Sequence, residues 1–149
     1  MSQYGYGAQN DAKIAGTGGV VMPTAPQTIT LPYPPTANHF KVPVQAGRGV
    51  RMILSKEARQ YKETVANILS RYTFSLLTGP ITVHVDLFRP RKVGDLENGL
   101  KVAIDCLSGV AFEDDKQIVS LHAYRHDDKQ NPRIEITVRA VTEWYLGVK

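Results

Sequence analysis

The chain has 149 residues, of which 42% are hydrophobic and 21% charged, and its formal net charge is +4. This length suits one domain of ordinary size and excludes two, and no apolar run is long enough to cross a bilayer. The single cysteine, Cys106, excludes an intramolecular disulfide, and its apolar neighbours favour a buried role. The basic excess is mild, so it permits a nucleic-acid partner without demonstrating one.

The N-terminal segment differs in composition from the rest. Residues 1–25 hold five of the twelve glycines and show neither helical nor strand periodicity. We therefore expect a flexible Gly-rich tail followed by a single domain over residues 26–149. The segment has neither the basic opening nor the apolar stretch of a secretory signal, so the expected location is the cytoplasm.

The first half of the predicted domain contains a strand and a helix. Alternating apolar residues predict a short strand at Thr28–Leu31, ended by prolines, and a polar loop after it. From Ser55 the apolar residues recur at helical spacing, and the Ser55 hydroxyl is a suitable N-cap. The apolar face of this helix comprises Ala58, Tyr61, Val65, Ile68, Leu69 and Tyr72.

The second half alternates strand and helix. Strands are predicted at Ile81–Phe88, Gln117–Tyr124 and Arg133–Val141, and we expect the last two to pair as an antiparallel hairpin. A second helix is predicted at Leu96–Leu107. Two helices are too few to cover both faces of a sheet. The predicted fold is therefore α+β, a two-layer α/β sandwich with a mixed sheet of about four strands and two helices. The apolar stripe of the second helix comprises Leu96, Leu100, Ala103, Ile104 and Leu107.

Acidic residues bracket this second helix. Successive residues of a helix advance by about 100°, so Asn98, Lys101 and Asp105 share one polar face opposite the apolar stripe. Asp95 and Glu97 lie at the start of the helix, where free amides favour negative side chains. Three further acids at residues 113–115 follow the helix, directly before the next strand.

Such an arrangement is suited to phosphodiester hydrolysis. This reaction uses a metal ion to activate water and to offset phosphate charge, and Mg²⁺ prefers carboxylate and water oxygens. A lysine on the same face, here Lys101, stabilises the charge that develops in the transition state. The alternative is that these residues have purely structural roles. Asp95 or Asn98 would cap the helix, and Lys101 and Asp105 would form an exposed ion pair worth about 0.3–0.5 kcal/mol. The acids at residues 113–115 would form a solvated turn.

The charge distribution favours a polyanionic substrate. Arg89, Arg91 and Lys92 directly precede Asp95, so cations that can neutralise backbone phosphates adjoin the candidate ligands. A solvated basic loop is the alternative for these three residues alone. The histidines lack HxH and HExxH spacing and are weaker candidates for a metal or general-base site: His84, His122 and His126.

Two motifs resemble the RusA family of Holliday junction resolvases, small endonucleases often carried by phages and prophages. The family pattern is D-x-D-N-x-x-K-x-x-x-D, followed after about ten residues by D-D-x-Q-[IV]. The chain reads DLENGLKVAID from Asp95 and DDKQI from Asp114. Its segment ITLPYPPTANH, from Ile29, is similar to the family's opening strand and Pro-Pro turn. The resemblance spans about residues 29–141.

The resemblance implies an Mg²⁺-dependent homodimer, for which Mn²⁺ can substitute, that nicks four-way DNA junctions in pairs during recombination and repair. It assigns the metal-binding acids to Asp95, Glu97 and Asp115, and the essential lysine to Lys101. Asp95 and Asp115 are also catalytic in this assignment. The supporting residues are Asn98, Asp105 and Asp114. The DNA-contacting residues are Asn38, His39, Arg89, Arg91 and Lys92.

One position departs from the family pattern. Glu97 stands where the family usually has aspartate, which keeps the charge but adds a methylene to the side chain. Two alternatives therefore stay open: a junction-binding protein with weakened cleavage, and a metal-dependent nuclease for other branched nucleic acids.

Overall fold

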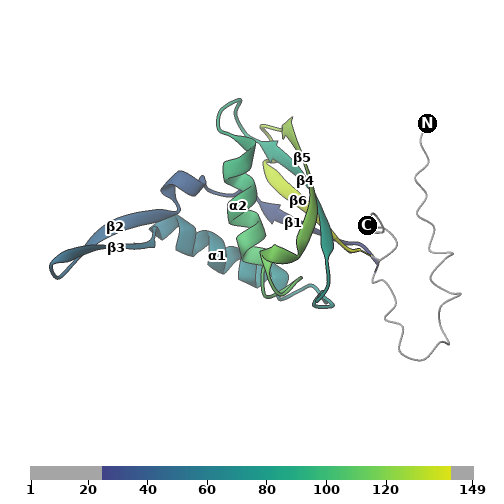
Figure 1. Ribbon diagram of the computed structural model, residues 1–149. Coiled ribbons are helices and arrows are strands. Elements are labelled where there is room, and N and C mark those ends of the chain that lie inside the picture. The colour runs from purple at the N-terminus through teal and green to yellow at the C-terminus, as the bar shows by residue number, and fades with distance from the viewer. Residues whose placement is uncertain (1–24, 142–149) are drawn as a thin grey trace, which may run out of the picture.

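The computed structural model describes residues 25–141, so the tail predicted at residues 1–25 lies, except for its last residue, outside the described residues. Its elements are shown in Figure 1. In chain order they are β1 (Gln27–Pro32), η2 (Ala37–His39), β2 (Lys41–Ala46), β3 (Gly49–Leu54), α1 (Lys56–Leu69), β4 (Ile81–Arg89), α2 (Leu96–Leu107), η3 (Asp115–Gln117), β5 (Ile118–Asp127) and β6 (Arg133–Ala140). No helix within residues 25–141 is long and apolar enough to cross a membrane.

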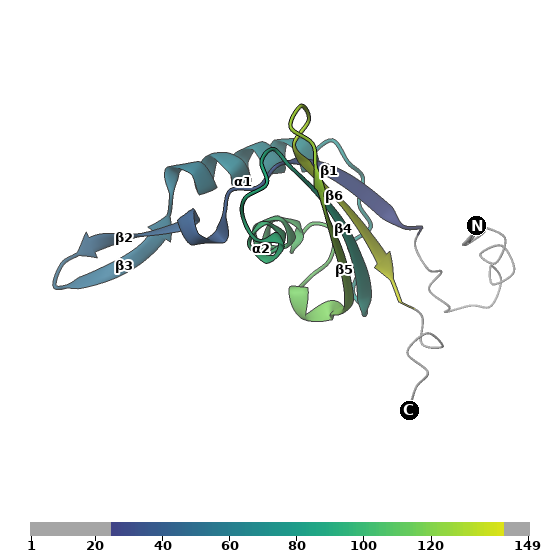
Figure 2. The same ribbon diagram turned by 90° about the horizontal axis from the view of Figure 1, so that it is seen from above.

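The main sheet has four strands in the order β1-β6-β4-β5. β4 pairs antiparallel with β6 and parallel with β5, so the sheet is mixed. Figure 2 shows α1 and α2 on the same face of this sheet. The predicted α+β sandwich with a four-stranded mixed sheet and two helices is therefore confirmed.

The predicted hairpin of the last two strands is wrong, because β4 lies between β5 and β6. Alternating apolar residues indicate which face of a strand is buried but not which strand is its neighbour. The five residues at 128–132 connect β5 to β6. When extended they span up to about 17 Å, which exceeds the roughly 10 Å between strands two places apart.

A second sheet, formed by β2 and β3, occupies the region predicted to be a polar loop. Its strands pair from Lys41↔Leu54 to Ala46↔Gly49, which leaves a two-residue turn. Gly47 takes a φ of +60° at the first turn position, as glycine does in tight hairpins. The first of these strands was not predicted because it contains Pro43, and proline is tolerated in a sheet only at edges or bulges.

The helix α1 begins where the sequence predicts. Ser55 accepts a hydrogen bond from the Ala58 amide at 3.1 Å, which confirms the predicted N-cap. The buried face ends with Leu69, the last residue of the helix, and Tyr72 lies beyond it with 39% exposure. Including Tyr72 in the helical face was therefore wrong.

The core lies between the main sheet and the helices. One face of β4 is fully buried, as predicted, and comprises Ile81, Val83, Val85 and Leu87. Gly99 lets α2 approach this face closely, because a Cβ there would lie 3.3 Å from Leu87 Cδ2. Gly99 and Val102 are buried in addition to the predicted stripe. The buried face of α2 is therefore wider than the spacing of its apolar residues in the sequence indicated.

Candidate active site

The helix α2 positions most of the candidate residues. It connects the end of β4 to the start of β5, which runs parallel to β4. The N-terminus of α2 therefore lies at the end of the sheet where β4 finishes, and its C-terminus lies at the end where β5 begins (Figure 1).

Asp95 occupies the N-cap position of α2 but does not cap the helix. Its backbone is extended, with φ −88° and ψ 143°, and its side chain accepts no hydrogen bond from the first turn. Ser55, at the same position of α1, does accept one. The Asp95 carboxylate is exposed and, among residues 25–141, has no hydrogen-bond or ion-pair partner, so the capping alternative does not hold for this residue.

An exposed row of charged side chains continues along α2. Glu97, Lys101 and Asp105 are all exposed and follow one another at i, i+4 spacing, which places neighbours about 5–6 Å apart at Cβ. Asn98 beside them is half-buried. None of the ion pairs found between described residues includes Lys101 or Asp105. The predicted polar face is present, and Lys101 forms no ion pair with Asp105.

The turn before β5 holds Asp114 and Asp115 in different ways. Asp114 caps η3, because its Oδ1 accepts from the Lys116 amide at 2.9 Å and its own amide donates to Gln117 Oε1 at 2.7 Å. Gln117 Nε2 donates to the carbonyls of Leu77 and Gly79, both at 2.8 Å, and so anchors the turn. Asp114 therefore has a structural role that leaves Asp115 exposed beside it.

The two neighbouring carboxyl groups shift each other's pKa in opposite directions. The pKa of Asp114 is lowered, mainly by the hydrogen bond from the Lys116 amide. The pKa of Asp115 is raised, mainly by its hydrogen bond with Asp114 and further by the negative charge of Asp105. Asp105 and Asp115 therefore lie close enough to interact, at the C-terminal end of the charged row.

A single chain does not bring the three assigned metal ligands together. Asp95 and Glu97 lie at the start of α2, and Asp115 follows its end. The twelve residues of α2 extend about 18 Å, whereas ligands of one Mg²⁺ ion each lie about 2.1 Å from it. No group of three His, Cys, Asp or Glu side chains within residues 25–141 is arranged to hold a metal ion. One chain alone therefore does not fit the ion that the resemblance implies.

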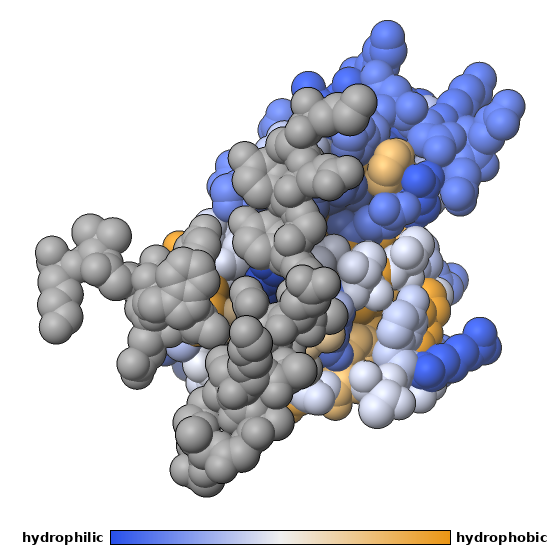
Figure 3. Space-filling model, turned by 90° about the vertical axis from the view of Figure 1, so that its right-hand side faces the viewer, coloured by the Kyte–Doolittle hydropathy of each residue, from blue (hydrophilic) through white to orange (hydrophobic). Residues whose placement is uncertain are grey.

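Cations gather beside the start of α2. Arg89 donates a hydrogen bond to Asp127, and the charges of Arg89, Lys92 and Arg125 lower the pKa of that carboxyl further. Arg125 Nη1 lies 3.5 Å from the Gly94 carbonyl oxygen. Figure 3 shows hydrophilic side chains gathered toward the top of the molecule, the end where β4 and β5 finish.

These cations differ in their availability to a substrate. Arg91 and Lys92 are exposed, whereas the side chain of Arg89 is only 12% exposed and is engaged by Asp127. Arg125 was missed in the sequence because only the parallel pairing of β4 and β5 places it beside the Asp95 loop. The basic segment is therefore present next to Asp95, with Arg125 in addition to the predicted residues.

The Pro-Pro turn lies against α2 from the other side. Asn38 and His39 are exposed in η2, which contacts α2. The His39 Nδ1 atom lies 3.3 Å from the Thr36 hydroxyl. A cavity of about 270 Å³ beside η2 is lined by residues including Lys41, Lys62, Lys101 and Asp105. Lys62 of α1 was not among the predicted residues, since no spacing in the sequence connects it to α2.

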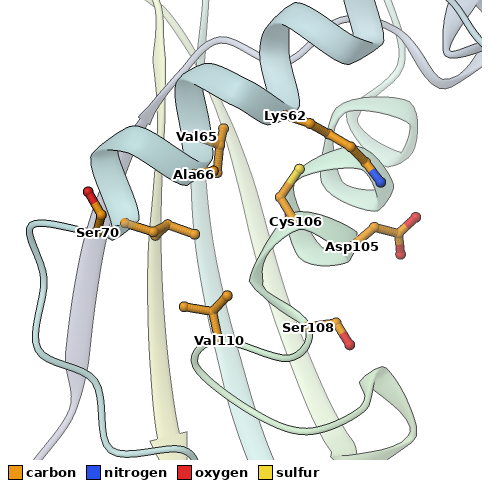
Figure 4. Close-up of a pocket in the computed structure, with 9 residues that line it drawn as sticks. Lys62, Val65, Ala66, Ser70, Asp105, Cys106, Ser108 and Val110 are labelled. Atoms are coloured by element: carbon orange, nitrogen blue, oxygen red, sulfur yellow. The ribbon is translucent and has the colours of Figure 1, made fainter.

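A second cavity, of about 450 Å³, lies between α1 and α2 and also includes Lys62 and Asp105 (Figure 4). Val65 and Cys106 are among the residues that line it. Cys106 is half-buried, and burial raises its pKa, in keeping with the apolar role predicted for it. The two cavities share Lys62 and Asp105 and therefore adjoin each other beside the C-terminal half of the charged row.

The strand histidines His84 and His126 lie elsewhere. His84 Nε2 and His126 Nε2 lie 3.1 and 2.7 Å from the two carboxylate oxygens of Asp86. This cluster is on the face of β4 opposite its buried residues, whereas α2 packs against the buried ones. His84 and His126 are therefore separate from the charged row.

No curated protein matches the chain. The profile of the family described as endodeoxyribonuclease RusA matches residues 32–139, which cover the Pro-Pro turn, all of α2 and the turn before β5. These nucleases resolve Holliday junctions and generally depend on a divalent metal. The chain therefore belongs to the RusA family of endodeoxyribonucleases.

Proposed function

We propose that the protein is a homodimeric, Mg²⁺-dependent endonuclease that resolves four-way DNA junctions by paired symmetric nicks, with Mn²⁺ able to replace Mg²⁺. The observation that carries this proposal is that Asp95, at the N-cap of α2, and Glu97 and Lys101 on the helix are exposed, and that their side chains have no hydrogen-bond or ion-pair partner among the described residues. Carboxylates without partners, a lysine beside them and exposed cations nearby suit a phosphodiester substrate, because such cations can stabilise charge on the phosphate and neutralise the DNA backbone. The proposed setting is recombination and repair in the cytoplasm of a bacterium or a phage-infected host.

The second protomer is needed to complete the ligand set. A twofold axis that sets two α2 helices antiparallel places Asp95 and Glu97 of one protomer opposite the partner subunit's Asp115. Two equivalent sites result, one for each nick. When bound there, the ion would supply activation of the attacking water and would offset the charge of the scissile phosphate.

The remaining residues bind and orient the DNA. Lys101 lies one helical turn from Glu97, where its ammonium group can stabilise charge on the phosphate or the leaving oxygen. Arg91 and Lys92 contact backbone phosphates, which fix the register of the duplex without reading its sequence. Asn38 and His39 contact the junction from the other side of α2.

A nicking assay tests this proposal. The purified protein, incubated with a synthetic four-way junction and Mg²⁺ or Mn²⁺, should give symmetric nicks in opposite strands and none in EDTA. Duplex of the same sequence, at the same ionic strength, should stay intact. Binding of the junction without cleavage in either metal would favour the weakened alternative, and Glu97→Asp should then raise the rate. Equal cleavage of flaps and junctions would instead favour a general nuclease for branched substrates.

A further inference from the structure

The β2–β3 hairpin, residues 41–54, extends away from the rest of the molecule (Figures 1 and 2). Its two strands pair with each other and with no other strand among the described residues. Gln45 Nε2 donates a hydrogen bond to the Gly47 carbonyl oxygen at 3.1 Å, which holds the turn at the tip. The hairpin is therefore a two-stranded ribbon outside the main sheet.

The hairpin and the cavity at its base carry positive charge. Residues 41–54 include three cations and no acidic residue. The cavity of about 270 Å³ at the base of the hairpin is lined by Lys41, Lys62 and Lys101 and by one acid, Asp105. None of the ion pairs found between described residues includes these three lysines. Cations without an acidic partner attract a polyanion, and the polyanion of the proposed function is DNA.

One face of the hairpin continues this cavity. Residues that pair directly across two strands lie on the same face, and so does every second pair along the strands. The first pair, Lys41 and Leu54, lines the cavity. Farther out, the same face carries Met52, which is 55% exposed, and Val50, which is 68% exposed. This cavity-side face comprises Lys41, Pro43, Gln45, Val50, Met52 and Leu54.

Cations lie at both ends of the cavity-side face, with apolar side chains between them. Lys41 is at the base, and Arg48 is in the two-residue turn at the tip. The six residues of β2 span about 20 Å, which is the length of about six base pairs of DNA. Phosphates border a DNA groove on both sides, and base edges with thymine methyl groups form its floor. The order of side chains on this face therefore matches a groove of duplex DNA.

The width of the hairpin selects the major groove. This groove is about 12 Å wide and admits a two-stranded ribbon, whereas the minor groove is only about 6 Å wide. Exposed apolar side chains such as Val50 also occur in protein interfaces. The lysines of the adjoining cavity favour DNA over a protein partner, because an apolar protein surface would bury their charges without compensation.

We infer that the β2–β3 hairpin is a DNA-binding ribbon whose cavity-side face lies in the major groove of one duplex arm of the junction, while Lys41 and Lys62 bind the backbone where that arm approaches Lys101. This inference rests on the proposed junction substrate and identifies the surface that holds one of its arms. The hairpin directly follows η2, so the proposed contacts of Asn38 and His39 lie at its base.

Equilibrium binding of the full chain to a synthetic four-way junction in EDTA, without cleavage, tests this inference. Lys41→Gln/Arg48→Gln should bind about 10-fold or more weakly at 0.1 M salt. Its plot of log affinity against log salt should be shallower by about 1.8, because each phosphate contact contributes about 0.9. Lys62→Gln should lower the slope by about 0.9. The matched control is Arg51→Gln, which removes a charge from the opposite face of the same hairpin and should keep the wild-type slope.

Methylation interference with dimethyl sulfate identifies the groove. Methyl groups on guanine N7 lie in the major groove, and they should weaken wild-type binding over a stretch of one arm. Val50→Asp puts a negative charge on the cavity-side face, so it should lower junction affinity and abolish that interference. Interference only from adenine N3 methyl groups, which lie in the minor groove, would overturn the inference.

The substituted side chains are all exposed, so circular dichroism and melting temperature should be unchanged. Equal loss of slope in Arg51→Gln and in each single variant of the cavity-side face would show that overall charge attracts the DNA, and would overturn the inference. If Val50→Asp keeps its junction affinity but alters sedimentation, the face binds protein and the inference is wrong. Binding that follows these expectations without any nicking would refute the proposed activity alone, so the two failures are distinguishable.

Discussion

Replacing Asp95 with asparagine is expected to lower the rate of junction nicking at least ~100-fold, comparable to the loss of one charge-stabilising group in other active sites. The substitution keeps the shape of the side chain and removes its negative charge. Because the carboxylate does not cap α2, the helix loses no hydrogen bond and the melting temperature should change little. The measurement is single-turnover cleavage of a labelled four-way junction at saturating protein.

The matched control for this prediction is Glu113→Gln. Glu113 is an exposed acid of the same region that lies outside the assigned ligand set, so its loss should leave the rate within about twofold, as is usual for surface substitutions away from a site. Junction affinity of Asp95→Asn should be retained or slightly increased, because a negative charge near phosphates is removed. Equal losses of rate in Asp95→Asn and Glu113→Gln would contradict a specific role for Asp95.

Replacing Lys101 with glutamine is expected to reduce kcat about 100- to 1,000-fold, the range seen when one transition-state donor is removed. KM should change much less, because an interaction that forms only in the transition state affects kcat. Lys101 is exposed and makes no ion pair with a described residue, so the fold should be unaffected. Steady-state cleavage over a range of junction concentrations separates the two constants.

Lys129→Gln is the control for the loss of positive charge. Lys129 is exposed in the connection between β5 and β6 and is not assigned to the site, so its kcat should stay near the wild-type value. If Lys101→Gln instead raises KM and leaves kcat unchanged, Lys101 binds the DNA backbone and has no part in the chemical step.

Local structure was predictable from sequence because it depends on neighbouring residues. The Ser55 cap, the alternation along β4 and the apolar stripe of α2 each follow from side chains within a few positions of one another. The neighbours of β5 and β6 were not predictable in this way, since strand order depends on contacts distant in sequence. The β2–β3 hairpin was missed for a related reason: among residues 25–141 its two strands pair only with each other.

The site was predicted residue by residue but not in its spatial arrangement. The motif indicated Asp95, Glu97 and Asp115 as a single ligand set, yet the intervening residues form a helix about 18 Å long. Arg125 joins the basic segment only through the parallel pairing of β4 with β5. The separation of the acids is therefore the main correction from the structure, and it is the reason for proposing a site shared between two protomers.

Mixed dimers of two inactive variants test this central claim most directly. Asp95→Asn and Asp115→Asn chains carrying different affinity tags would be co-expressed, and the heterodimer would be purified through both tags. If each active site is shared between protomers, one of the two sites in the heterodimer keeps both carboxylates. The heterodimer should then nick one strand of the junction, whereas each homodimer should nick none. A heterodimer as inactive as both homodimers would contradict the shared site.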